Sequence, residues 1–62
     1  MFQAGQEVLI VSCKDDPRAA GRTGRIVDET PPGPLTNGRW TVHRVGLLIG
    51  SVLCHTSELR PI

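Results

Sequence analysis

The sequence predicts an all-β fold: one small domain, residues 1–62, built as a partly closed barrel of about five short strands. Aliphatic and β-branched residues occur in short runs separated by glycine and proline, and no segment has the apolar period of a helix. The content of 39% hydrophobic and 21% charged residues is typical of a folded chain. A chain of 62 residues can bury only a small core, which excludes large enzyme architectures.

The first strand is predicted at residues 7–12, a short β-branched run. Successive side chains of a strand point to opposite faces, so we expect Val8 and Ile10 to fill the core. Leu9 and Val11 then need a second cover on the other face, either from a terminal segment of the chain or from another subunit. A homodimer is therefore one of the two arrangements that would cover this face.

Residues 13–23 predict a long loop, because they mix Asp, Pro, Arg and Gly without helical periodicity. Strand character resumes at residues 24–28, which predict the second strand. Ile26 is expected to point inward, with Arg25 and Val27 on the opposite face.

Residues 30–38 predict a turn region, because their three prolines supply no backbone donor for a sheet. Pro31 and Pro34 have the spacing of a PxxP ligand, but we interpret the segment as a connecting loop. Residues 39–45 alternate apolar and polar side chains and predict the third strand, with Trp40 and Val42 pointing inward.

The glycines at positions 46 and 50 predict a turn or bulge, followed by a fourth strand that runs through about His55. Residues 56–59 predict one short 3₁₀ turn, for which Thr56 can supply the cap. Residues 60–62 predict a last small strand.

Three segments resemble the small SH3-like barrels: Gly5-Gln6-Glu7-Val8-Leu9-Ile10-Val11, Gly21-Arg22-Thr23-Gly24-Arg25-Ile26-Val27 and Leu59-Arg60-Pro61-Ile62. The first two also resemble a degenerate KOW motif with a longer intervening loop. The resemblance implies an SH3-like barrel and, as in many KOW-like domains, binding of RNA or DNA. Independently of the resemblance, Gly5 and Gly24 are expected to let the backbone turn sharply.

The formal net charge of +1 is too balanced to indicate a partner. Basic residues around the predicted long loop could together bind phosphate, without reading a base sequence. Nearby acidic residues can neutralise this surface, and the chain has few aromatic rings for stacking on bases. We therefore favour a solvated loop and keep nucleic-acid binding as an alternative. The residues concerned are Lys14, Arg18, Arg22 and Arg25.

Zinc-compatible side chains occur at Cys13, His43, Cys54 and His55, but they lack the paired spacing of a metal site, so no metal is predicted. The two cysteines lie far apart in the sequence, and we expect reduced thiols. Cys54 and His55 point to opposite faces of a strand and cannot readily share a proton. With no phosphate loop or nucleophile elbow, the sequence predicts no catalytic residue, no cofactor and no enzyme.

The leading hypothesis is a non-catalytic binding or assembly module that contacts protein, either itself or a partner, through apolar strands. Its basis is an excess of aliphatic residues over what one small core can enclose. One alternative is nucleic-acid binding through Arg18, Arg22 and Arg25. A second is an oligomeric reductase, because a plasmid-borne dihydrofolate reductase also uses an SH3-like barrel. The expected interface residues are Leu9, Val11, Leu47, Leu48 and Ile49.

A peptide-binding SH3 groove is disfavoured, because it needs several aromatic residues and this chain has only Phe2 and Trp40. Trp40 could floor a ligand groove, but we favour its interpretation as a packing residue with a satisfied indole donor. No apolar run reaches the roughly 18 residues of a membrane span, and the N-terminus lacks the pattern of a secretory signal. We therefore expect a cytoplasmic protein with no membrane partner.

Overall fold

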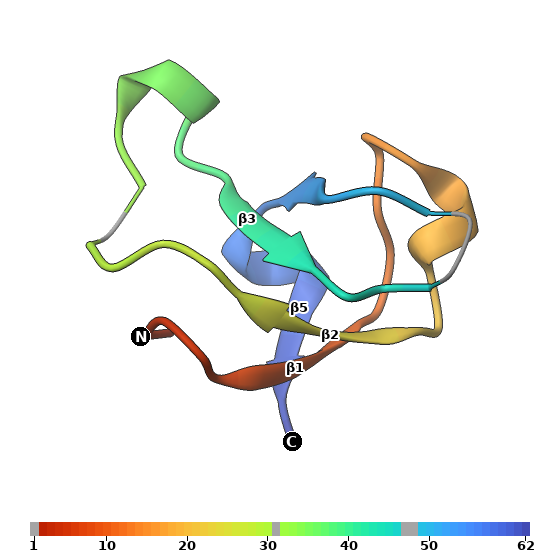
Figure 1. The fold of residues 1–62 in the computed structure, drawn as a ribbon. Helices are drawn as coiled ribbons and strands as arrows, with labels where there is room; N and C mark the ends of the chain where they lie inside the picture. Colours follow the sequence, from red (N-terminus) through yellow and green to blue (C-terminus); the bar gives the residue numbers. More distant parts are fainter. Residues whose placement is uncertain (1, 31, 47–48) are drawn as a thin grey trace.

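The structure is a computed structural model that describes residues 2–30, 32–46 and 49–62. Antiparallel strands form a single five-stranded sheet that curls into a half-barrel (Figure 1), which confirms the predicted all-β fold. The strands are β1 (Glu7–Ile10), β2 (Thr23–Ile26), β3 (Trp40–His43), β4 (Val52–Cys54) and β5 (Leu59–Pro61). Three 3₁₀ turns connect them: η1 (Pro17–Ala19), η2 (Pro34–Thr36) and η3 (Thr56–Glu58).

The strands follow the spatial order β4-β3-β2-β1-β5. Strands β1 to β4 each pair with the next strand along the chain. β5 instead pairs with β1, which brings the end of the chain beside its beginning. Turns η1 and η2 lie at opposite ends of the sheet (Figure 1). Among the described residues, no helix has the length and hydropathy required to cross a bilayer.

The predicted loop at residues 13–23 was wrong in two places, because Pro17–Ala19 forms η1 and Thr23 already belongs to β2. Proline at the first position of η1 has its backbone angle preset for a helical turn. The Asp16 carboxylate caps the turn by accepting a hydrogen bond from the Arg18 N–H. Both features are local, but they span too few residues for a periodicity to reveal them.

Other strand boundaries also differ from the predicted ones: β2 already ends at Ile26, and β5 covers Leu59–Pro61. β1 ends at Ile10, since the N–H of Val11 donates to the Glu58 carbonyl in η3 at 2.8 Å. β3 ends at His43, because Arg44 has a φ of 59°, which is left-handed backbone. Both strands are therefore shorter than their runs of β-forming residues.

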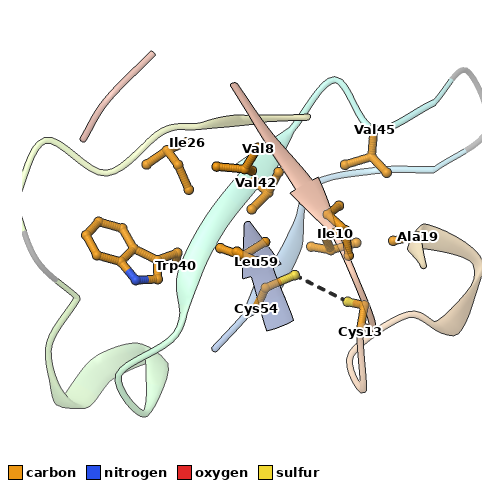
Figure 2. Close-up of a cluster of buried hydrophobic side chains, with 11 residues drawn as sticks. Val8, Ile10, Cys13, Ala19, Ile26, Trp40, Val42, Val45, Cys54 and Leu59 are labelled. Atoms are coloured by element: carbon orange, nitrogen blue, oxygen red, sulfur yellow. Dashed lines mark hydrogen bonds between the residues drawn. The ribbon is translucent and has the colours of Figure 1, made fainter. Parts of the chain in front are cut away.

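The inner face of the sheet carries the predicted core residues, none more than 4% exposed: Val8, Ile10, Ile26, Trp40 and Val42. Further buried residues come from the loops and the later strands: Cys13, Ala19, Val45, Val52, Cys54 and Leu59. Figure 2 shows the core as one cluster, with Trp40 at one end and Ala19 at the other. This small cluster contains the apolar side chains whose burial stabilises the fold.

The two glycines expected at sharp turns have different roles. Gly5 has a φ of 82° in the turn before β1, which confirms that prediction. Gly24 instead lies in the middle of β2, on its inner face. A Cβ atom on Gly24 would lie 2.6 Å from Cγ1 of Val42 and 2.9 Å from the carbonyl oxygen of His43. Gly24 therefore allows β2 and β3 to approach closely.

Candidate functional site

An open groove of about 520 Å³ lies beside Trp40. Its walls come from the N-terminal segment, the loop between β2 and β3, the start of η3 and the end of β5. Four of its lining residues have ring side chains, namely Phe2, Pro32, Trp40 and Pro61, and two have polar side chains, Gln6 and Thr56. We call this site the Trp40 groove.

Trp40 is held rigidly at the groove. Its indole Nε1 donates a hydrogen bond to the Thr56 hydroxyl at 3.0 Å, and its ring meets that of Phe2 edge-on, with centroids 5.6 Å apart. The residue is only 4% exposed, which confirms its interpretation as a packing residue with a satisfied donor. Trp40 belongs to the core cluster and is also one of the residues that line the groove.

The groove gathers both aromatic residues of the chain, Phe2 and Trp40. The low aromatic content of the sequence argues only against a peptide-binding SH3 groove, which needs several aromatic residues. The chain has only two aromatic rings, but the fold brings both of them to one groove, which Pro32 and Pro61 also line. Phe2 lies in a segment without strand alternation, so nothing in its local sequence indicates that it meets Trp40.

Arg18, from the predicted phosphate-binding set, pairs with Asp16. The Nη2 atom of Arg18 lies 2.8 Å from Oδ2 of Asp16, and Nε lies 3.0 Å from Oδ1. Hydrogen bonds from the Arg18 side chain and backbone lower the pKa of Asp16 below its ordinary value. Lys14 is exposed nearby in the sequence, and its backbone N–H donates to Glu58.

The other two arginines of that set have different neighbours. Arg25 lies on the outer face of β2, where its Nη1 donates to the carbonyl of Gly5 at 3.0 Å. Arg22 precedes β2 and lies against Gly46, whose ideal Cβ position is 3.4 Å from Nη1 of Arg22. The three arginine side chains therefore contact the cap of η1, the turn before β1 and the segment after β3.

The predicted protein-interface residues are partly covered. Val11 is 45% exposed, Leu9 is half-buried, and Ile49 is half-buried and packs against the core. Leu47 and Leu48 lie outside the described residues. Within the described part of this set, Val11 is the most exposed apolar side chain.

Cys13 and Cys54 meet in the core, with their sulfur atoms 3.5 Å apart, although they are 41 positions apart in the sequence. Both are free thiols and both are buried. His43 lies half-buried on β3 and His55 is exposed before η3. Among the described residues, no three potential ligands from His, Cys, Asp and Glu gather as a metal site.

Burial raises the pKa of Cys54 from 9.0 to about 12, and its hydrogen bond to Cys13 adds to the shift. Below pH 9.0 the folded and unfolded chains both hold this proton, so the shift has no effect on stability. At higher pH the unfolded chain loses the proton while the folded chain keeps it. The free energy of unfolding of the reduced protein should therefore fall by roughly 1 kcal/mol for each pH unit, until the folded thiol titrates.

Urea denaturation of the reduced protein at several pH values above 9.0 measures this loss. The Cys54→Ala variant is the control, because it lacks the thiol and should lack that part of the pH dependence. Equal slopes in both proteins would contradict the assignment.

Glu58 is a buried carboxylate, 6% exposed, with a structural role. Its Oε1 accepts a hydrogen bond from the His55 N–H at 2.8 Å, and its Oε2 accepts one from the Lys14 N–H at 3.0 Å. The prediction that Thr56 caps η3 was wrong: Thr56 is the first residue of the turn and its hydroxyl accepts from Trp40. Glu58 caps the turn and also ties it to the segment after β1.

Comparison of this chain with models of protein families, with curated proteins and with solved structures finds no significant match. The geometry of its own residues therefore carries the functional argument. None of the described residues that line the Trp40 groove has a titratable side chain. These residues can bury apolar surface and accept or donate single hydrogen bonds, but they supply no acid or base.

Proposed function

We propose that this protein is a small non-catalytic binding module that takes an apolar segment of another protein into the Trp40 groove. The observation that carries the proposal is an open groove lined by Phe2, Pro32 and Pro61, next to Trp40, which is 4% exposed and whose ring packs edge-on against Phe2. Apolar surface removed from water contributes about 25 cal/mol per Å². Aromatic anchors also dominate the binding energy of many protein interfaces.

The groove is prepared for binding before a partner arrives. The hydrogen bond to Thr56 and the contact with Phe2 already hold the Trp40 ring, and proline rings have little side-chain freedom to lose. Binding to such a site costs less ordering entropy than binding to flexible side chains. Gln6 and Thr56 can fix the orientation of a bound backbone through hydrogen bonds.

The other proposals have less support from the structure. Contact through the apolar strands would rest chiefly on Val11 and half-buried Leu9, because Ile49 packs against the core. Nucleic-acid binding would use three arginines whose side chains contact three different segments, and one of them is already paired with Asp16. No contact among the residues that the structure describes favours a reductase.

Peptides selected from a random-sequence phage library on the immobilised protein should be rich in apolar residues and should bind at the Trp40 groove. The Pro32→Asp variant should weaken their binding at least about tenfold, because a carboxylate at the groove wall would lose its hydration when the peptide docks. Binding measured by isothermal titration checks the loss. The emission of Trp40, the single tryptophan, reports contact at the groove.

Val11→Asp is the matched control, with the same new side chain on the exposed part of the predicted strand interface. It should change peptide affinity less than about twofold. Loss of binding in Val11→Asp with retention in Pro32→Asp would place the contact on the strands instead. Failure to select any peptide above background would contradict the proposed function.

A further inference from the structure

The two buried cysteines make a contact that the Trp40 groove does not use. Cys13 follows β1 and Cys54 is the last residue of β4, and Figure 2 shows their sulfur atoms directed toward each other. Their separation of 3.5 Å is a non-bonded contact between two thiols. A disulfide has a sulfur–sulfur distance of about 2.05 Å, so the sulfurs need to approach by only about 1.5 Å.

The backbone around Cys13 is already docked on β4. The Cys13 thiol donates to the Leu53 carbonyl at 3.8 Å, and the Leu53 N–H donates to the Asp15 carboxylate at 3.1 Å. The Asp16 N–H donates to the Cys13 sulfur at 3.4 Å and orients it. These bonds hold the segment against the residue next to Cys54, so small side-chain adjustments rather than strand movements can close the gap.

We propose that Cys13 and Cys54 form a reversible thiol–disulfide site, oxidised by low-molecular-weight disulfides such as oxidised glutathione. Cys13 is the attacking residue, because it lies on a loop and retains 4% exposure, whereas Cys54 is fully buried in β4. Cys54 is the resolving residue. The site makes the oxidation state of the solution a determinant of the stability of the fold.

The reaction takes two exchange steps. The Cys13 thiol loses its proton and attacks one sulfur of oxidised glutathione; a mixed disulfide forms, and one glutathione leaves as a thiolate that takes up a proton. The Cys54 thiol then loses its proton and attacks the Cys13 sulfur, and the second glutathione leaves in the same way. Two cysteine thiols are thereby oxidised by two electrons, and one oxidised glutathione becomes two thiols.

The bond would join residues 41 positions apart. A link of this length removes much conformational entropy from the unfolded chain. In a domain of this size, the melting temperature of the oxidised protein should exceed that of the reduced protein by on the order of 10 °C or more. Cys54 also pairs with Trp40 across β3 and β4, so the emission of Trp40 should change on oxidation.

The test equilibrates the wild-type protein with mixtures of reduced and oxidised glutathione, starting from both the reduced and the oxidised protein. Mass spectrometry should show the loss of two hydrogen atoms without a glutathione adduct, and the product should be monomeric with the higher melting temperature. Cys54→Ala should keep one glutathione on Cys13, because the resolving thiol is missing. Cys13→Ala should stay unmodified, because Cys54 is buried.

The mass, the oligomeric state and the melting temperature of the wild-type protein test the proposal even if a variant does not fold. A lasting glutathione adduct, a disulfide-linked dimer or a protein still reduced in excess oxidised glutathione would each overturn it. An oxidised monomer that melts no higher than the reduced one would show that the bond strains the fold, and would overturn it as well.

Discussion

Replacing Gly24 by alanine is expected to destabilise the protein by about 3 kcal/mol or more, which is at the upper end for an overpacked core. The added methyl group would lie 2.6 Å from Cγ1 of Val42 and 2.9 Å from the carbonyl oxygen of His43. The oxygen belongs to the backbone of β3, which is bonded to β2 on one side and β4 on the other. It cannot move away without disturbing the pairing of His43 with Arg25. Chemical denaturation of wild type and variant measures the loss.

Gly33→Ala is the matched control, because a Cβ atom there has no heavy atom within 4 Å and the residue has a φ of −114°. Its effect should stay within about 0.5 kcal/mol. In the Gly24→Ala background, Val42→Ala should cost less than it does alone, because it relieves the contact with Cγ1. The contact with His43 would remain, so the rescue should be partial. A Gly24→Ala protein as stable as Gly33→Ala would contradict the close approach of the two strands.

Replacing Glu58 by alanine is expected to lower the free energy of unfolding by roughly 2 to 3 kcal/mol. The buried carboxylate accepts hydrogen bonds from two backbone N–H groups, those of His55 and Lys14. These groups lie 41 positions apart in the sequence, so the carboxylate links η3 to the segment after β1. Loss of the link should also weaken the bond from Val11 to the Glu58 carbonyl.

Two further variants separate the contact from the charge. Glu58→Gln keeps the shape and one accepting oxygen, but its amide group faces one of the two N–H donors, so we expect an intermediate loss. Ser57→Ala changes the exposed neighbour in the same turn and should have little effect. Hydrogen exchange of the Lys14 and His55 amides should accelerate in Glu58→Ala and stay unchanged in Ser57→Ala. Equal stability of all three variants would contradict the linking role.

Alternation along the strands predicted the core residues correctly for a local reason. A strand turns successive side chains to opposite faces, so Val8, Ile10 and Ile26 needed only their immediate neighbours for their direction to be inferred. The 3₁₀ turn before the last strand was also predicted from local residues. Its cap was not, because Glu58 reaches back across the turn and also binds a backbone group of a distant loop.

Gly24 shows that the local sequence does not reveal why a particular residue is required. The sequence pattern predicts a sharp turn at Gly24, but this residue lies within β2. A glycine is required there because atoms of β3 lie against β2, and their positions depend on the pairing of those strands. A residue type can therefore be predicted correctly while the physical reason for it is not.

The amino-acid sequence alone determined the all-β class, the inward residues of the strands and the turn glycine at Gly5, because each depends on backbone preferences within a few residues. Only the tertiary structure decided which distant side chains meet. The curl of the sheet brings Phe2 to Trp40 and Cys13 to Cys54. Such contacts depend on which strands pair and on the return of β5 to β1, and a pattern of a few neighbouring residues does not specify either. Both the groove and the thiol pair therefore became visible only in the folded chain.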